Sequence, residues 1–171
     1  MLPAASNGSP ARYRCELRPG DAAAVRRLVA ATGFFSAAEI DVAVELVDEA
    51  LARGSASGYE FLFADDAGHE GELTGYTCYG PIPATRSSYD LYWIAVAPGR
   101  QGSGLGRELL RESERRARAA GATTMYVDTS GRAQYAPTRR FYERSGYAKA
   151  AELPDFYAPG DAKIIYARAL G

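Results

Sequence analysis

The chain has 171 residues, of which 47% are hydrophobic, 20 are basic and 21 are acidic. This length is typical of one domain, and the hydrophobic fraction can build a buried core. The balanced charge favours neither a nucleic acid nor a membrane surface as partner. No stretch is long and apolar enough to cross a membrane, and residues 1–10 lack the features of a secretion signal. We therefore expect a cytoplasmic protein with a flexible N-terminus over residues 1–11 and a single domain over residues 12–171.

Disulfide, metal and histidine chemistry are not favoured by the residues present. Cys15 and Cys78 fit neither a disulfide framework nor a metal-ligand spacing, so we interpret both as thiols of the core. The single histidine, His69, lies in the predicted turn DDAGHEGE, where a solvated side chain is more common than a catalytic one. No cluster of metal-ligating residues is recognisable, so we expect no metal.

The first half of the chain predicts a strand, two helices and a hairpin. The strand, in YRCELRPGD, precedes a helix that Asp21 can cap and that ends at Gly33. In the next segment, Ser36 and Glu39 have the spacing of a capping box, and apolar residues recur at helical intervals as far as Gly54. The segments YEFLFADD and GELTGYTCYG flank a glycine-containing turn and predict a β-hairpin.

The second half predicts a central strand followed by alternating helices and strands. The segment YDLYWIAVAP is apolar at alternating positions on both faces, which is typical of a strand covered on both sides. A helix from about Gly104 to Ala120, the strand TTMYVDTSG, a short helix in APTRRFYERSG and two final strands follow, with PDFYAPGD as the loop between these strands. The order βααβββαβαββ indicates one α/β domain. One face of the longer predicted helix comprises Leu105, Leu109, Ser113 and Ala117.

The segment GRQGSGLGREL, residues 99–109, gathers glycines where this longer helix begins. Unpaired N–H groups and a partial positive charge at a helix N-terminus bind phosphate, and glycine permits its close approach. The segment either holds a pyrophosphate or is a glycine-rich turn without a ligand. It matches neither the Walker A motif nor the dinucleotide fingerprint, because no lysine follows and Arg107 replaces the third glycine.

The glycine segment fits a different pattern, Q/R-x-x-G-x-G/A, through Gln101, Gly104 and Gly106. The segment WIAVAPGRQGSGLGRELL resembles the acetyl-CoA signature of the GNAT superfamily of N-acetyltransferases. Further on, YAPTRRFYERSGY resembles the second signature of that family, and the order of elements over roughly residues 12–170 is similar too. The resemblance implies a mixed, mostly antiparallel central sheet flanked by helices. Tyr135 stands where many relatives carry asparagine, which leaves open whether its hydroxyl replaces the amide contact.

The resemblance also implies how acetyl-CoA would be bound as co-substrate, without a metal. Backbone N–H groups of the glycine segment would hold the pyrophosphate, and the central strand would pair with the pantetheine arm. The implied cofactor-binding residues are Ile94, Ala95, Val96, Gln101, Gly102, Ser103, Gly104, Leu105, Gly106, Arg107, Pro137 and Tyr142.

Acetyl transfer requires a neutral amine, a donor to the oxyanion and a proton for the leaving thiolate. By family analogy Tyr142 supplies that proton; the alternative is an ordinary aromatic core residue. For the base we predict Asp128, with Asp90, Glu45 and Glu39 as alternatives. Taken alone, each of these carboxylates is more commonly a solvated or capping group, so the sequence does not single out the base.

In the family fold, the first two helices, the hairpin and the last loop border the acceptor cleft. The predicted acceptor-binding residues are Phe35, Tyr79, Trp93 and Tyr157, with Phe34 and Phe156 as further candidates. Core packing explains each of them as well, and Asp161 either closes a turn or attracts a cationic acceptor.

We expect direct transfer of acetyl to a primary amine of a small molecule. The alternatives are a peptide or protein N-acetyltransferase and a non-catalytic CoA-binding regulatory module. Relatives with exposed C-terminal strands often dimerise, so a homodimer is one expected assembly.

Overall fold

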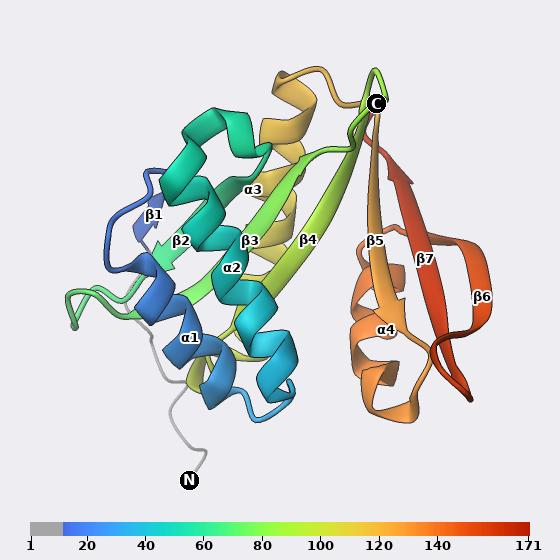
Figure 1. Ribbon diagram of the computed structural model, residues 1–171, viewed down its shortest axis with the longest axis horizontal. Helices are drawn as coiled ribbons and strands as arrows, with labels where there is room; N and C mark the ends of the chain where they lie inside the picture. The colour runs from blue at the N-terminus through green and yellow to red at the C-terminus, as the bar shows by residue number, and fades with distance from the viewer. Residues whose placement is uncertain (1–11) are drawn as a thin grey trace, which may run out of the picture. The chain divides into compact units, whose positions relative to one another are not determined.

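The computed structural model describes residues 12–171 and contains seven strands and four α-helices in the predicted order (Figure 1). The predicted flexible segment 1–11 lies outside the described residues. The strands form a mixed, mostly antiparallel sheet in the order β1-β2-β3-β4-β5-β7-β6, in which β4 and β5 are parallel. Within residues 12–171, no helix combines the length and apolar character needed to cross a bilayer.

The chain divides into two compact units, which share β3, β4 and α3. The first unit extends to Cys78 and resumes at Trp93–Leu109. Its elements are β1 (Arg12–Arg14), α1 (Asp21–Ala31), α2 (Ala37–Arg53), a 3₁₀ turn (Gly54–Ser57), β2 (Glu60–Asp65), most of β3 (Leu73–Pro81), the end of β4 (Ser88–Val96), a second 3₁₀ turn (Pro98–Arg100) and the start of α3 (Leu105–Ala119).

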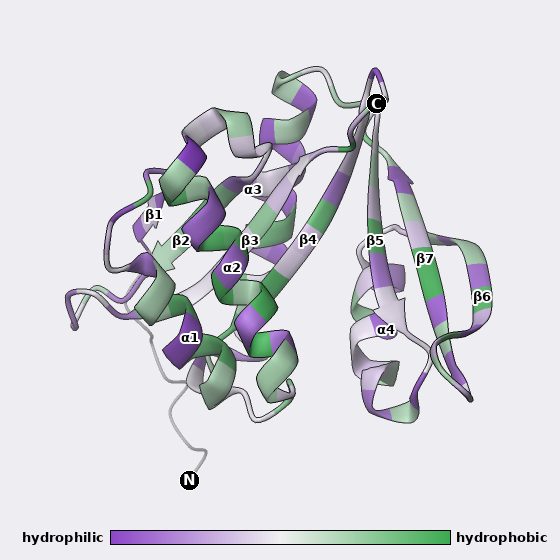
Figure 2. Ribbon diagram, in the orientation of Figure 1, coloured by the Kyte–Doolittle hydropathy of each residue, from purple (hydrophilic) through white to green (hydrophobic). Residues whose placement is uncertain are grey.

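Helices α1 and α2 lie side by side in the first unit (Figure 1) and carry alternating hydrophobic and hydrophilic bands (Figure 2). The capping box that begins α2 is confirmed. The Ser36 hydroxyl accepts from the Glu39 N–H at 3.3 Å, and the Glu39 carboxylate accepts from the Ser36 N–H at 2.8 Å. The two reciprocal bonds satisfy donors that a helix N-terminus otherwise leaves unpaired.

The predicted capping role of Asp21 is wrong. Asp21 is the first residue of α1, and the preceding Gly20 makes no side-chain cap. The Asp21 carboxylate instead accepts from the Arg18 N–H at 2.7 Å and pairs with the Arg14 guanidinium at 2.6 Å. Charge-assisted bonds to a guanidinium are stronger than a bond to a neutral amide, so the arginine on β1 holds this carboxylate.

The start of α3 is anchored in the first unit by its predicted buried face. Leu105 and Leu109 are buried with Leu62 and Ala64 of β2, and Ser113 and Ala117 are buried further along the helix. A methyl group added at Gly75 on β3 would lie 2.8 Å from the Leu109 side chain and 3.0 Å from the Ala95 carbonyl oxygen. Glycine at this position therefore permits α3 to pack directly on the strand, a requirement that sequence periodicity does not show.

The second unit comprises Tyr79–Tyr92 and Leu110–Gly171. It contains β5 (Thr124–Ser130), a 3₁₀ turn (Ala133–Tyr135), α4 (Ala136–Arg144), β6 (Ala148–Ala158) and β7 (Asp161–Ala169). β7 pairs with β5 on one side and with β6 on the other. Glu114 on α3 ties the helix to the final hairpin, because it accepts from the Tyr147 hydroxyl at 2.9 Å and from Arg168 at 2.9 Å.

Two predictions about the second half and the cysteines need correction. The predicted loop PDFYAPGD is largely strand, because β6 continues to Ala158 and shifts its register between Leu153 and Ala158. The strand tolerates Pro154 because β6 is at the edge of the sheet, where a missing N–H breaks no ladder bond. Cys78 is buried as predicted, whereas Cys15 is exposed and is not a core thiol.

Candidate functional site

The glycine segment forms an exposed loop between β4 and α3. Gly102 and Gly104 have φ angles of +75° and +95°, which non-glycine residues adopt at a steric cost. A methyl group added at either position would meet nothing within 4 Å. These two glycines are therefore required by backbone conformation and not by crowding, and the space beside them is open.

The loop presents several unpaired backbone donors. Within residues 12–171, the N–H groups of Gly102, Gly104, Leu105 and Gly106 have no hydrogen-bond acceptor. Those of Arg107 and Glu108 are already bonded to the Gly104 carbonyl oxygen, at 3.0 and 3.1 Å. Open N–H groups at the positive end of a helix form a binding site for an anion, and phosphate is the anion that proteins most often bind there.

Side chains of the loop fix its shape and leave those donors open. The Ser103 hydroxyl donates to the Arg100 carbonyl oxygen at 2.6 Å, and the Gln101 amide donates to the Val96 carbonyl oxygen at 3.3 Å. Leu105 is 2% exposed and holds the end of the loop in the core. Ile94 and Val96 pack against this core cluster, and Ala95 is buried. The predicted cofactor-binding residues 94–96 and 101–106 are thus brought together in the first unit.

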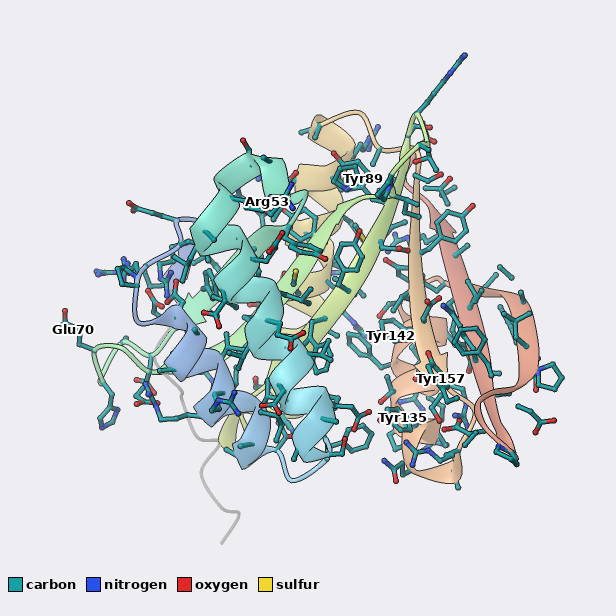
Figure 3. The ribbon with its side chains drawn as sticks, in the orientation of Figure 1. Arg53, Glu70, Tyr89, Tyr135, Tyr142 and Tyr157 are labelled. Carbon is teal, nitrogen blue, oxygen red and sulfur yellow. The ribbon has the colours of Figure 1, made fainter. Side chains whose placement is uncertain are left out.

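Tyr142 lies in α4 among other aromatic rings of the second unit (Figure 3). Its ring centroid is 5.3 Å from that of Phe141, 5.7 Å from that of Tyr147 and 6.2 Å from that of Tyr166. Its hydroxyl has no hydrogen-bond partner within residues 12–171. Burial raises the pKa of Tyr142 above its ordinary value, so the phenol stays protonated at neutral pH and is a weaker acid than free tyrosine.

The segment between β5 and α4 is fixed by a network that sequence reasoning did not identify. The Ser130 hydroxyl donates to Asp161 at 2.5 Å, and Asp161 pairs with Arg132 at 3.0 Å. Arg139 of α4 donates to the carbonyl oxygens of Ser130 and Arg132, at 2.7 and 3.0 Å. Because both oxygens of the buried Asp161 are engaged, this carboxylate braces the segment and is not available to a cationic acceptor.

Two other predicted contacts belong to the same part of the second unit. Tyr135, at the position where relatives carry asparagine, is 7% exposed and lies under the Arg132 guanidinium at 5.4 Å. Pro137 is in the first turn of α4, where its missing N–H breaks no bond. Arg107 is exposed on the first turn of α3.

Asp128 and Asp90, both candidates for the base, lie on adjacent strands. Asp128 on β5 forms an ion pair with Lys163 of β7 at 2.5 Å. Asp90 on β4 is half-buried and has no hydrogen bond or ion pair within residues 12–171. Burial, and then the charge of Asp128, raise the pKa of Asp90 to about 6, against the opposing effect of Lys163. The predicted base is thus already engaged, and its neighbour is not.

The remaining alternatives for the base are placed in the first unit. Glu39 is engaged in the capping box, and Glu45 is exposed on α2. His69 is exposed in the hairpin turn, as predicted. In the described part of the chain, no group of three or more His, Cys, Asp or Glu residues could hold a metal ion.

The predicted acceptor-binding residues occupy different environments. Phe35 and Trp93 contact each other in the first unit, with ring centroids 5.1 Å apart, and the Trp93 indole N–H is buried without an acceptor within residues 12–171. Tyr79 is 1% exposed, whereas Tyr157 is 50% exposed and its ring contacts that of Phe156 on β6. Their roles in acceptor binding stay predictions.

The sequence and the fold resemble those of known proteins. Residues 28–147 match the sequence model of the Acetyltransferase (GNAT) family. Streptothricin acetyltransferase of Streptomyces lavendulae is 28% identical, with 84% of each chain covered. A GNAT-family protein of known structure from Desulfovibrio desulfuricans has a TM-score of 0.90 and 52% identity, covering 94% of this chain and 99% of that one. A protein from Salmonella typhimurium, solved with acetyl-CoA, has a TM-score of 0.69 and 21% identity over 95% of both chains.

The chain belongs to the GNAT acetyltransferase family, because the family model spans most of its length. It is an acyltransferase, and the mixed sheet flanked by helices is the fold that the sequence predicted.

Proposed function

We propose that the protein is an acetyl-CoA-dependent N-acetyltransferase that transfers acetyl directly to a primary amine of a small molecule. The observation that carries this proposal is the set of open N–H groups at Gly102, Gly104, Leu105 and Gly106. In this proposal they hold the CoA diphosphate, which explains why a conformationally costly glycine loop precedes α3.

The second requirement is a group that assists the departure of the CoA sulfur. We assign it to Tyr142, whose hydroxyl has no partner within residues 12–171 and is therefore available to a ligand. Because burial raises its pKa further above the value of about 8.5 typical of a thiol, complete proton transfer from the phenol to the CoA thiolate is unfavourable. The phenol therefore donates a hydrogen bond that stabilises the negative charge gathering on sulfur while the carbon–sulfur bond breaks, and the proton that sulfur finally gains is balanced by the one that the amine nitrogen loses.

The third requirement is an acceptor amine. The curated relative acetylates streptothricin by its name, which supports a small-molecule acceptor for this chain. A small amine bearing positive charge is also consistent with the carboxylates on β4 and β5. An ammonium group must lose a proton before its nitrogen can attack, so a nearby carboxylate serves both binding and chemistry.

The experiment is a screen of primary amines, with streptothricin first, that measures CoA thiol released from acetyl-CoA. We expect release that depends on the amine, together with a thermal stabilisation by acetyl-CoA alone. Amine acetylation only on peptide N-termini would replace the small-molecule acceptor by a peptide. Stabilisation by acetyl-CoA without turnover of any amine would identify a binding module and contradict the proposal.

A further inference from the structure

Asp90 differs from the other carboxylates of the protein. Within residues 12–171, every other buried or half-buried carboxylate accepts a hydrogen bond or forms an ion pair. Asp21 and Asp65 pair with Arg14, for example, and Glu114 pairs with Arg168. Asp90 alone among them has neither kind of partner. A half-buried carboxylate without a donor is unfavourable for folding, which suggests that its partner is a ligand.

The strand register places Asp90 beside two other charged side chains. Asp90 of β4 is paired with Tyr126 of β5, and Asp128 is two residues further along β5, on the same face. Asp128 is paired with Ile165 of β7, and Lys163, two residues away, is on that face as well. Three neighbouring strands thus align a carboxylate, a second carboxylate and an ammonium on one face of the sheet.

Lys163 does not serve Asp90 as a direct partner. Its ammonium is bound to Asp128 at 2.5 Å and lies 4.9 Å from the centroid of the Phe156 ring. The charged groups that influence Asp90 are therefore Asp128, which opposes its ionisation, and Lys163, which favours it. β3, the neighbour of β4 on the side away from β5, carries no charged residue over Leu73–Pro81. Asp90 consequently stays ionised at neutral pH and yet takes up a proton readily, as a general base requires.

We propose that Asp90, and not Asp128, is the base that takes the proton from the acceptor ammonium, and that Asp128 and Lys163 position and tune it. This inference rests on the proposed acetyl transfer. One proton of the ammonium moves to the Asp90 carboxylate and then to solvent. The freed electron pair of nitrogen forms the bond to the acetyl carbon, and the carbon–sulfur bond breaks with its electron pair on sulfur. Nitrogen loses a second proton, which balances the proton that sulfur gains.

The test compares the pH dependence of kcat/KM for wild type, Asp90→Asn, Asp128→Asn and Lys163→Gln, with the amine that the screen selects. Wild type is expected to lose activity as the pH falls through about 6. This loss of activity at low pH is the acidic limb of the pH profile. Asp90→Asn is expected to lower kcat by about 100-fold or more and to abolish the acidic limb. Asp48→Asn, at an exposed carboxylate of α2 without a partner in the described chain, is the matched control. It should change neither kcat nor the acidic limb.

The substitutions Asp128→Asn and Lys163→Gln, beside Asp90, give the sharper result, since they are expected to shift the acidic limb in opposite directions. Asp128→Asn removes a like charge and frees Lys163, which should move the limb to lower pH. Lys163→Gln removes the favourable charge and should move it to higher pH. A structural role of these residues would reduce activity without opposite shifts of the limb.

Two outcomes overturn the inference while leaving the proposed function intact. One is an Asp90→Asn variant that keeps the wild-type kcat and the wild-type acidic limb. The other is an acidic limb that moves in neither Asp128→Asn nor Lys163→Gln. If the wild type acetylates no amine although acetyl-CoA stabilises it, the proposed function fails and the role of Asp90 fails with it. Stabilisation of every variant by acetyl-CoA, measured in parallel, shows whether a loss of activity reflects misfolding.

Discussion

In our two proposals, the loop before α3 and the charged face of β4, β5 and β7 bind a ligand by different means. The loop uses the main chain: Gly102 and Gly104 adopt positive φ, and the N–H groups of residues 102 and 104–106 have no acceptor within residues 12–171. The charged face uses side chains that the strand register brings together, and there Asp90, near the Asp128–Lys163 ion pair, has no partner within residues 12–171. Main-chain recognition depends on conformation and suits a ligand that many relatives share, whereas side-chain recognition is easily altered and suits a particular acceptor.

The largest effect is expected from the side-chain machinery. Tyr142→Phe removes a hydroxyl that has no partner within residues 12–171, so the fold should be unaffected. We expect kcat to fall by about 10²- to 10⁴-fold, because the leaving sulfur loses its donor. Tyr166→Phe, which removes only the 2.8 Å bond to Glu143 in the same aromatic cluster, is the matched control. A wild-type kcat at saturating substrates in Tyr142→Phe would show that the phenol has no part in the reaction.

The main-chain site should respond through cofactor affinity. Gly104→Ala places a side chain in a left-handed backbone region, so the free loop should relax to another conformation, and restoring the binding conformation should cost roughly 1–2 kcal/mol. We expect the Kd for acetyl-CoA, measured by calorimetry, to rise about tenfold, because 1.4 kcal/mol corresponds to one factor of ten. Gly99→Ala adds the same methyl group to the same loop at an ordinary φ and in open space, and should leave the Kd unchanged. Equal changes of the Kd in Gly104→Ala and Gly99→Ala would exclude a conformational role of Gly104.

Stability of the first unit should depend on its helix cap. Ser36→Ala removes the acceptor for the Glu39 N–H, and we expect the free energy of unfolding to fall by about 1 kcal/mol. Ser36→Asp retains an acceptor at this position and should restore most of the loss in the same denaturant titration. A failure of aspartate to restore stability would indicate that the hydroxyl acts in some other way.

The smallest expected effect is a pH-dependent stability difference at Asp90. Because its pKa is raised to about 6 in the folded protein, the protonated form favours folding, and stability is lost as the pH rises through about 6. Asp90→Asn cannot ionise, so its Tm should exceed that of the wild type above pH 6, and the difference should shrink toward pH 4. A Tm difference independent of pH between 4 and 8 would argue against an unfavourably placed carboxylate.

Local signals in the sequence predicted the local structure. The Ser36–Glu39 spacing specified a cap that the structure contains, and the spacing of Leu105 and Leu109 specified the buried face of α3. The glycine loop was also predictable, because positive φ demands glycine itself. Each of these features depends on residues that are close together in the chain.

Features that depend on distant residues were not predictable in the same way. Asp21 was expected to cap α1, but an arginine on β1 holds it. β6 was expected to stop before Pro154, whose position at a sheet edge only the topology reveals. Asp90 and Asp128 were both recognised as candidates, but Lys163, which engages one and not the other, comes from a strand whose register the sequence does not specify.

The most direct test of the account is an NMR titration of the isotope-labelled protein with CoA that follows the backbone amide signals. We predict that the amides of Gly102, Gly104, Leu105 and Gly106 shift most and saturate together, whereas the Arg100 amide, which already donates to the Ala97 carbonyl oxygen at 2.8 Å, shifts little. CoA that binds while those four signals stay in place would contradict the claim that the main chain of this loop holds the diphosphate.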